Sequence, residues 1–509
     1  MKRDLKRLSG ETFDILVIGG GIHGAAVAYE AARCGLAVAL IEKKDFAWAT
    51  SANSLKIIHG GIRYLQQADL FRLRESVRAR REMMAFAGDF IQPLPCIIPT
   101  YGFGIKSKEM MRLALGLYDI LSRDRNKGLP KTKAIPPGRI LSKKECLALF
   151  PEARPNGLSG AALWYDALAA DTERIPLTYI LKAVGMGSVA ANYFEAVDLI
   201  RRQNQVAGVK GVDILTGQEL ELKAGTVINA SGPWMNEVVQ SKKFKPLGWV
   251  KGMNLVIRKK LVSKCAVGLE MPQKTKSKNT GNDDNRMLFL VPWKGHTLIG
   301  TLYKAFNEKP DTLKVEESEA REFLDIVNTA FPAAKLDLDD VSFFHCGLLP
   351  SHKIRDSHPS AIPDGHSEII DHEKTDGLKG IISIKSVKYT TAPQLAKRVM
   401  SHLKAKGVIK KGPGQKKDCG KAIPAPSDVF TTGKEGVDPE VVFHAVNEEM
   451  ACRLSDLVFR RTNLGTAGPP QKRVLVAAAR AMGELLGWTP QRIKEEIQEV
   501  DSCYAFRNS

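Results

Sequence analysis

The stretch Phe13-Asp-Ile-Leu-Val-Ile-Gly19-Gly-Gly21-Ile-His-Gly24 decides the fold of this 509-residue chain. Its apolar run, residues 13–18, is typical of a parallel strand that is buried on both faces. The three numbered glycines then follow the G-x-G-x-x-G spacing. In this spacing the first glycine permits a tight turn, the second lets a pyrophosphate approach the backbone, and the third lets a helix pack against the strand. The pattern predicts a strand-to-helix turn that binds the phosphates of a dinucleotide.

The residues after the glycines complete a βαβ unit. Residues 22–34 are predicted to form a helix whose N-terminal N–H groups and positive dipole end face the phosphates. A second apolar stretch, residues 36–41, ends at Glu42, where a carboxylate accepts hydrogen bonds from ribose hydroxyls. An acidic residue here favours FAD or NAD over NADP, because it suits an unphosphorylated ribose. The alternative is a tight βα turn without a ligand.

Composition is that of a globular protein with an unusual charge. Hydrophobic residues make up 44% of the chain and charged residues 26%, which are ordinary values. The sequence has no run of 18 or more apolar residues, so we expect no transmembrane helix. The polar start, residues 1–7, lacks the apolar core of a secretory signal. The eight cysteines form no C-x-x-C, which predicts reduced thiols in a cytoplasmic protein and no metal site.

The net charge of +19 allows contact with nucleic acid, an anionic membrane or an anionic substrate. No nucleic-acid-binding motif accompanies the charge, so we expect no nucleic-acid partner. The arginines of 72–81 can equally be a solvated helix face, and the lysines of 410–417 can equally belong to a flexible linker. An amphipathic helix predicted over 109–122 would suit peripheral docking at the inner face of the membrane.

The rest of the chain predicts further elements. Gly185 and Gly187 follow a helix-like segment, so they indicate a helix C-cap turn and not a second nucleotide loop. The prolines of 92–104 are expected to break regular structure. Other expectations are a helix over 69–87, a strand over 226–230, a mobile loop over 272–286, a hairpin over 286–303 that turns near Lys294-Gly295, a linker over 405–437, and helices over 438–509 with Gly487 and Thr489-Pro490 at helix ends.

The segment Ala49-Thr-Ser-Ala-Asn-Ser-Leu-Lys56-Ile-Ile-His59-Gly-Gly-Ile-Arg63-Tyr64-Leu is more specific than the glycine turn. Together with residues 19–42, it resembles the FAD-dependent glycerol-3-phosphate dehydrogenases of the glycine/D-amino-acid oxidase fold group. Further matching pieces follow in order over about residues 12–500: 165–166, 171–174, 230–234, 291–301, 388–391 and 451–462.

The resemblance implies an α/β fold in which a Rossmann-like FAD-binding domain carries an embedded, mostly antiparallel α+β substrate domain and a C-terminal helical domain. The boundaries that we predict are 10–95, 165–235 and 340–405 for the FAD-binding domain, 96–164 and 236–339 for the substrate domain, 406–437 for the linker and 438–509 for the helical domain.

The resemblance also assigns site residues. The predicted cofactor-binding residues are Gly19, Gly21, Gly24, Glu42, Thr50, Ser51, Ser54, Lys56, His59, Gly60, Gly61, Ala230, Gly232, Lys388 and Thr390. Lys388 suits a position near the flavin pyrimidine, where donors stabilise the charge of the reduced ring. Arg63 beside Tyr64 suits a fork that grips phosphate or carboxylate, or a surface salt bridge, and His59 suits either a site role or a structural hydrogen bond.

The chain departs from the family pattern around the expected substrate. Asn254 replaces a histidine, Leu349 replaces an arginine, and residues 364–372 do not match the Arg-Asp-Tyr segment. Ser386-Val387 and Ala392-Pro393 alter the late flavin motif. We therefore consider His345, His352 or Lys353 as a replacement for the missing basic group.

The resemblance implies a flavoenzyme that oxidises sn-glycerol 3-phosphate to dihydroxyacetone phosphate by hydride transfer to flavin N5. A base removes the hydroxyl proton, and electrons then pass to quinone, or to oxygen in an oxidase variant. The candidate catalytic residues are His59, Arg63, Tyr64, His345 and Lys388. The alternatives are a flavoenzyme for another hydroxy acid, amine or polyol phosphate, and a flavin-binding scaffold without activity.

Overall fold

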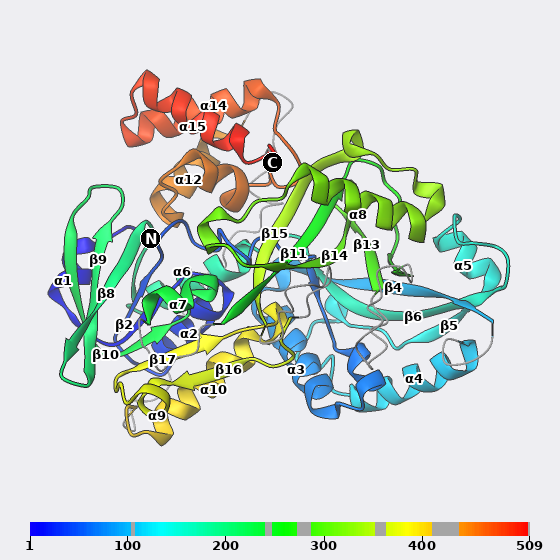
Figure 1. The fold of residues 1–509 in the computed structure, drawn as a ribbon, viewed down its shortest axis with the longest axis horizontal. Helices are drawn as coiled ribbons and strands as arrows, with labels where there is room; N and C mark the ends of the chain where they lie inside the picture. The colour runs from blue at the N-terminus through cyan, green and yellow to red at the C-terminus, as the bar shows by residue number, and fades with distance from the viewer. Residues whose placement is uncertain (103–106, 240–246, 272–286, 352–362, 410–436, 507–509) are drawn as a thin grey trace.

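The computed structural model describes residues 1–102, 107–239, 247–271, 287–351, 363–409 and 437–506. Two sheets and a C-terminal group of helices make up the molecule (Figure 1). This arrangement confirms the predicted fold class. In the described residues, no helix is long and apolar enough to cross a membrane.

The first sheet has eight strands and a parallel centre. β1 (Thr12–Ile18) lies between β2 (Val38–Ile41) and β10 (Glu219–Asn229), with β7 (Val189–Ala191) beside β2 and β17 (Ile381–Lys385) beside β10, all parallel. β16 (Glu368–Asp371) and the hairpin β8 (Phe194–Arg202) and β9 (Gln205–Asp213) add antiparallel pairs. The centre is parallel and covered on both faces, which explains the buried apolar residues 15–18 of β1.

Helices cover one face of this sheet, and they pack on one another. α2 (Ile22–Arg33) lies against α6 (Arg174–Gly185) and α10 (Ala392–Ala405) in the same apolar cluster as Ile15 and Val17. α1 (Leu5–Gly10) contributes Leu8 to the cluster on the opposite face. The predicted helix over 22–34 is thus confirmed, and the turn at Gly187 follows α6 as expected, with a φ of +102°.

The second sheet has nine strands and is almost entirely antiparallel. Its order is β15 (Val341–Ser351), β11 (Gly248–Ile257), β14 (His296–Phe306), β13 (Met287–Trp293), β12 (Ala266–Glu270), β4 (Ile91–Tyr101), β6 (Leu158–Ala169) and β3 (Ile57–Ile58), with β5 (Arg139–Ser142) also paired to β6. Around it lie α3 (Leu70–Phe86), α4 (Lys108–Leu121), α5 (Lys143–Leu149) and α8 (Glu317–Ala330). The hairpin of β13 and β14 turns at Lys294-Gly295, as predicted.

One prediction was wrong in this sheet. The proline-containing stretch 92–104 does not break regular structure, because Ile91–Tyr101 forms β4 and pairs with β6 along its whole length. Pro93, Pro95 and Pro99 occupy alternating positions, so their missing N–H groups lie along a single edge of the strand. Proline is tolerated in a strand where its nitrogen does not face the paired neighbour.

Residues 272–286 and most of the predicted linker 405–437 lie outside the described residues.

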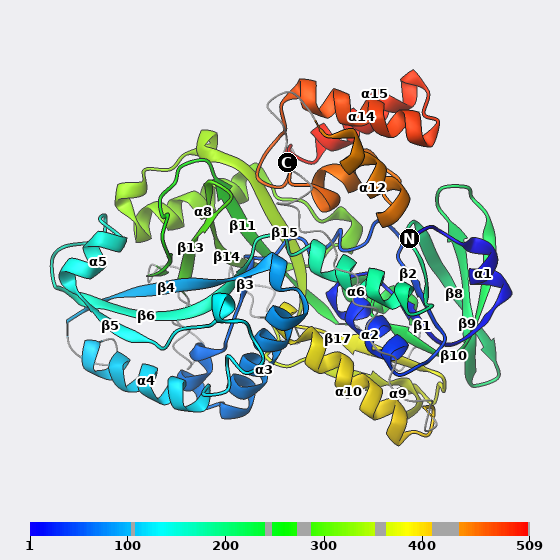
Figure 2. The same ribbon diagram turned by 180° about the vertical axis from the view of Figure 1, so that it is seen from behind.

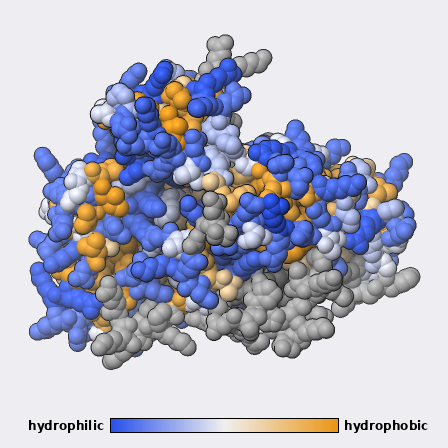
Figure 3. Space-filling model, turned by 45° about the horizontal axis from the view of Figure 1, so that its top comes forward, coloured by the Kyte–Doolittle hydropathy of each residue, from blue (hydrophilic) through white to orange (hydrophobic). Residues whose placement is uncertain are grey.

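The C-terminal region is helical, as predicted. α12 (Pro439–Glu449), α13 (Leu454–Asp456), a π-helical turn Leu457–Arg461, α14 (Lys472–Leu486) and α15 (Pro490–Ser502) follow in order. Gly487 ends α14 with a φ of +68°, and Thr489 caps α15 through the N–H of Arg492. The two short helices α7 (Met235–Val238) and α9 (His372–Asp376) complete the fold. Figure 3 shows that the face seen there is mainly hydrophilic, with hydrophobic side chains in scattered groups.

Candidate cofactor and active site

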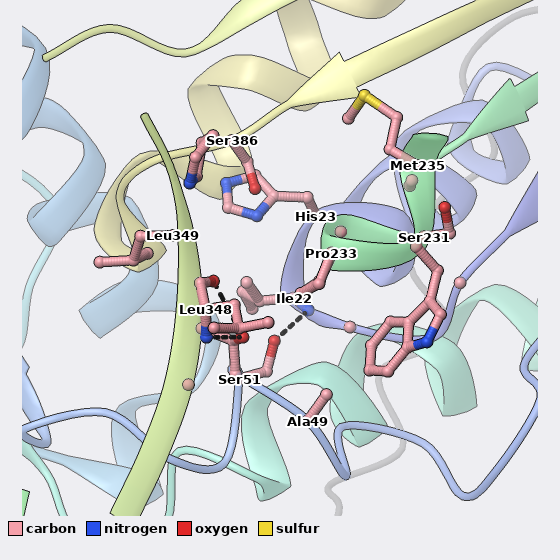
Figure 4. Close-up of a pocket in the computed structure, with 18 of the residues that line it drawn as sticks. Ile22, His23, Ala49, Ser51, Ser231, Pro233, Met235, Leu348, Leu349 and Ser386 are labelled. Atoms are coloured by element: carbon pink, nitrogen blue, oxygen red, sulfur yellow. Dashed lines mark hydrogen bonds between the residues drawn. The ribbon is translucent and has the colours of Figure 1, made fainter. Parts of the chain in front are cut away.

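A cavity of about 600 Å³ lies where the two sheets meet. The glycine turn after β1 and the chain after β2 form one part of its wall, and strands of the second sheet form another (Figure 4). The segments that line it are Ile18–His23, Glu42–His59, Phe194–Val197, Ala230–Val238, Leu247–Asn254, Thr301–Tyr303, Gly347–Pro350 and Ile384–Thr390, each in part. The volume lies in the range of ligand and cofactor sites.

The glycine turn has no room for side chains at Gly19 and Gly24. Gly19 has a φ of +108°, and a Cβ there would lie 2.5 Å from the carbonyl oxygen of Ala230. Gly21 begins α2 and lines the cavity, so the backbone is open to a ligand at the positive end of the helix. Gly24 does not line the cavity, because its role is packing: a Cβ there would lie 2.0 Å from the Gly19 carbonyl oxygen.

Glu42 is fixed at the cavity wall by three N–H donors. Its Oε2 accepts from the Gly20 backbone at 2.7 Å, and its Oε1 accepts from the Lys44 backbone at 3.1 Å and from Trp48 Nε1 at 3.0 Å. Burial raises the pKa of this carboxyl group, and the three hydrogen bonds oppose the rise. Each carboxylate oxygen can accept two bonds, so Oε2 can still receive a ribose hydroxyl.

Small polar residues of the next loop line the cavity, but Lys56 does not. Thr50, Ser51 and Ser54 line it, and Ser51 Oγ accepts the Ile22 N–H at 2.9 Å, which caps α2. The Lys56 ammonium group is buried and donates to the Ala52 carbonyl at 2.7 Å, to Thr172 Oγ1 at 2.8 Å and to Glu173 Oε2 at 3.0 Å. Lys56 therefore holds the loop in place from outside the cavity.

His59 and Asp166 form a hydrogen-bonded pair at the cavity. His59 lines the cavity with a side chain that is 41% exposed, and its Nδ1 lies 3.3 Å from Asp166 Oδ2. Asp166 is buried and also accepts from Arg80 at 3.0 Å and from the Gly60 backbone at 2.6 Å. Burial would raise the pKa of Asp166, but the bonds and charges of His59 and Arg80 hold it well below its usual range. Asp166 is thus an anion that fixes the orientation of the His59 ring.

Lys388 also lines the cavity. Its Nζ donates to Ser76 Oγ at 2.7 Å and lies 5.0 Å from the centre of the Tyr64 ring. Burial lowers the pKa of Lys388 to about 8, although the negative charges of Asp166 and Glu75 oppose this effect. Thr390, Ala230 and Gly232, three further predicted cofactor-binding residues, line the same cavity.

Several predicted site residues do not line the cavity. Gly60 and Gly61 pack against other side chains: a Cβ on Gly60 would lie 2.2 Å from the Tyr118 hydroxyl, and a Cβ on Gly61 would lie 2.8 Å from Ser76 Cβ. Arg63 is exposed outside the cavity lining, and Tyr64 reaches the site only through its contact with Lys388.

His345 does not take the place of the missing basic group in the cavity lining. It is buried, its Nε2 lies 3.3 Å from the Thr466 carbonyl, and burial lowers its pKa to about 3. His345 pairs in register with Asn254 across neighbouring strands, but only Asn254 lines the cavity. His352 and Lys353 lie outside the described residues.

The part of the wall that the second sheet forms has uncharged side chains at the two positions where the family pattern has a histidine and an arginine. We call it the neutral wall. Asn254 Oδ1 accepts from Thr301 Oγ1 at 2.8 Å, and Asn254 Nδ2 donates to the Asn53 carbonyl at 3.4 Å. Leu349 also lines the cavity and is seen in Figure 4 beside Leu348. In the family pattern these two positions hold a histidine and an arginine.

Trp48, Trp234 and His23 are among the cavity residues that the sequence analysis did not name as site residues. Trp48 and Trp234 line the cavity with ring centres 5.1 Å apart, and His23 lines it from the first turn of α2. His23 Nε2 is buried without a hydrogen-bond partner among the described residues, and burial lowers the pKa of His23 to about 4. The position of His23 inside the glycine motif was the available signal, because residues at a helix start face the bound phosphates.

Comparisons with known proteins agree with this site. Residues 14–398 match the protein-family model described as DAO, FAD dependent oxidoreductase. The chain is 35% identical over 354 residues to the alpha-glycerophosphate oxidase of Streptococcus pyogenes serotype M6, a match that covers 68% of this chain and 55% of that protein. It is 30% identical over 420 residues to the glycerol-3-phosphate dehydrogenase of a Synechocystis strain, which covers 79% of this chain and 72% of that protein.

A solved structure shares the fold over almost the whole chain. The glycerol-3-phosphate dehydrogenase from Bacillus halodurans, complexed with FAD, has a TM-score of 0.72 at 23% identity, with coverage of 99% and 98% of the two chains. The glycine oxidase from Geobacillus kaustophilus has a TM-score of 0.52 and covers 77% of this chain. The match to the Streptococcus protein spans about half of that relative's length.

This chain belongs to the DAO family of FAD-dependent oxidoreductases. The resemblance stated from the sequence is confirmed, and FAD is the cofactor. The cavity fits such a group, because Gly19 and Gly21 line it with backbone alone at the start of α2 and Glu42 presents a fixed acceptor beside them.

Proposed function

We propose that the protein oxidises sn-glycerol 3-phosphate to dihydroxyacetone phosphate. The names of two relatives, an alpha-glycerophosphate oxidase and a glycerol-3-phosphate dehydrogenase, support this substrate. The observation that carries the proposal is the His59–Asp166 pair, which lies with Lys388 in the same cavity as the glycine turn. When bound, FAD supplies a hydride acceptor at its N5 atom.

His59 is proposed as the group that removes the substrate hydroxyl proton. Asp166 accepts from Nδ1, so the Nε2 of a neutral His59 is the acceptor nitrogen. The anionic Asp166 also stabilises the imidazolium that forms. Lys388 provides positive charge for an anionic substrate or for the reduced flavin. Arg63 and Tyr64 remain candidates that only the resemblance supports.

A second candidate function rests on the neutral wall at Asn254 and Leu349. A pocket that lacks the positive charge of the arginine favours a substrate with less negative charge. A different hydroxy acid, amine or polyol phosphate is therefore the alternative, and a substrate panel separates it from glycerol 3-phosphate.

The experiment compares wild-type protein with His59→Gln and Asp166→Asn under anaerobic conditions. We expect glycerol 3-phosphate to reduce the flavin of the wild type, and the reduction rate of His59→Gln to be about 10²- to 10⁴-fold lower, with FAD still bound. Asp166→Asn is expected to lose less, because it disturbs the orientation of the ring and leaves the base in place. Lys385→Met is the control: it lines the cavity, but its ammonium group pairs with Asp364 and Glu368. An unchanged rate in His59→Gln would contradict the assignment.

We further propose that electrons pass to a membrane quinone and that α4 docks on an anionic membrane surface. Met110, Leu113, Leu117 and Ile120 lie along one face of α4, and Leu113 and Ile120 are each 69% exposed. Lys108 and Arg112 on the same helix are exposed too, and α4 lies at an edge of the molecule (Figure 2). Apolar side chains flanked by cations are typical of helices that lie in a membrane interface.

Co-sedimentation with vesicles tests this docking. The wild type should bind vesicles that contain phosphatidylserine and release at high salt, whereas Leu113→Glu should bind weakly. Leu485→Glu, at an exposed leucine of α14, should bind like the wild type. Equal binding by all three proteins, or no binding by the wild type, would contradict the proposal.

A further inference from the structure

Two consecutive arginines of the C-terminal region reach a carboxylate beside the cofactor cavity. Arg460 Nε donates to Asp45 Oδ2 at 2.5 Å, and Arg461 donates to the same carboxylate through NH1 and NH2, each at 2.8 Å. Asn192 adds a fourth bond to Asp45 Oδ1 at 3.0 Å. Asp45 is fully buried and Arg461 is 1% exposed, so water does not compete for these bonds. We call the set of Asp45, Arg460 and Arg461 the C-terminal clamp.

The clamp is itself fixed from the C-terminal side. Arg460 also donates to Asp456 Oδ1 at 2.7 Å, and Arg461 donates to the Glu449 carbonyl at 2.9 and 3.1 Å. Both arginines belong to the π-helical turn Leu457–Arg461. Burial alone would raise the pKa of Asp45, but the two arginines overcome that effect and lower it to about 2. Asp45 is therefore an anion that is held from one side by a separate part of the chain.

The residues next to Asp45 contact the glycine turn directly. The Ala47 N–H donates to the Gly20 carbonyl at 3.1 Å, and the Phe46 ring is so close to Gly20 that a Cβ there would lie 2.7 Å from it. On the other side of Asp45, Glu42 accepts the Gly20 N–H at 2.7 Å. The segment Glu42–Ala47 thus holds both backbone groups of Gly20, the residue between the two glycines that line the cavity.

From these contacts we infer that Arg460 and Arg461 are positioning residues for the cofactor: by holding Asp45, the C-terminal region sets the geometry of the glycine turn and hence the affinity for FAD. The turn binds phosphate through backbone groups, which have no side-chain freedom to compensate for a displaced segment. The inference rests on the cofactor and not on the proposed substrate. It gives the C-terminal helices a role in cofactor binding that they perform without lining the cavity.

The test measures the dissociation constant of FAD for apoprotein variants, together with their free energy of unfolding. Arg461→Met removes two of the bonds to Asp45, and we expect the dissociation constant to rise by about tenfold and FAD release to accelerate. The matched control is Lys251→Met, which breaks a buried ion pair away from the clamp: Lys251 lies 2.5 Å from Glu319 Oε1, and Lys251 does not line the cavity. It should lose stability and yet keep the dissociation constant within about twofold of the wild type.

Two results would overturn the inference. One is a wild-type dissociation constant in folded Arg461→Met protein; the other is an equal rise in Lys251→Met. Should Arg461→Met not fold, Arg461→Lys replaces it, because lysine keeps the charge but lacks the planar fork. That variant should bind FAD about threefold more weakly, and unchanged binding would contradict the clamp. A wild-type protein that fails to oxidise glycerol 3-phosphate leaves this comparison valid, because it measures binding alone.

Discussion

The two ends of the cavity follow the family pattern to different degrees. We call the end at the glycine turn the cofactor end; the other end is formed by the second sheet. At the cofactor end, Gly19, Gly21 and Glu42 stand where the pattern requires them, and each has a geometric reason. At the other end, Asn254 and Leu349 stand where the pattern has a histidine and an arginine, and both line the cavity. Backbone recognition of phosphates tolerates few residues, whereas a side-chain wall can change with the substrate. The two ends therefore respond differently to substitution.

The largest expected effect is at the cofactor end. Gly19→Val places a side chain where a Cβ already lies 2.5 Å from the Ala230 carbonyl oxygen, in a backbone conformation with a φ of +108°. We expect the purified variant to carry no FAD, as measured by flavin absorbance per protein. Gly116→Ala is the control, since a Cβ there meets nothing within 4 Å and the helix gains from alanine. Full FAD occupancy in Gly19→Val would contradict the assignment of the phosphate turn.

An intermediate effect is expected from the charge of Lys388. The pKa of this ammonium group is about 8, so the positive charge is present below pH 8 and is lost as the pH rises above that value. The concentration of glycerol 3-phosphate that gives half-maximal flavin reduction should rise by about tenfold between pH 7 and pH 9.5. Lys388→Arg keeps its charge over this range and should lack that rise. The same pH profile in both proteins would exclude Lys388 as the titrating group.

The smallest expected effect tests the neutral wall. Leu349→Arg adds a guanidinium group at the position where the family pattern has an arginine. If the natural substrate is a phosphate ester, this change should strengthen its binding by about tenfold or less, because arginine binds phosphate through two parallel hydrogen bonds. Leu349→Met is the uncharged control. Tighter binding of a non-phosphorylated substrate in Leu349→Arg would favour the alternative substrate class.

Elements that depend on local sequence were predicted correctly. Elements whose structure depends on contacts with distant segments were not. The glycine spacing fixed the βαβ unit, and Gly487 and Thr489 marked helix ends that the structure confirms. The strand Ile91–Tyr101 was missed, because the effect of its prolines depends on which edge pairs with β6.

The same reason explains the misplaced site residues. Lys56 stands in a segment typical of the family, yet its ammonium group turns away from the cavity to Glu173, more than a hundred positions along the chain. Spacing along the chain cannot reveal such a partner. The contact of Arg461 with Asp45 is equally remote in sequence and could not be predicted from either segment alone.

The most direct test of the account is anaerobic flavin bleaching by the two enantiomers of glycerol 3-phosphate. The account predicts that purified wild-type protein carries FAD and that the sn-glycerol 3-phosphate enantiomer bleaches its absorbance rapidly, whereas the mirror-image compound does so slowly or not at all. A bound flavin that stays oxidised with both enantiomers would contradict the proposed function. In that case the neutral wall at Asn254 and Leu349 serves a different substrate.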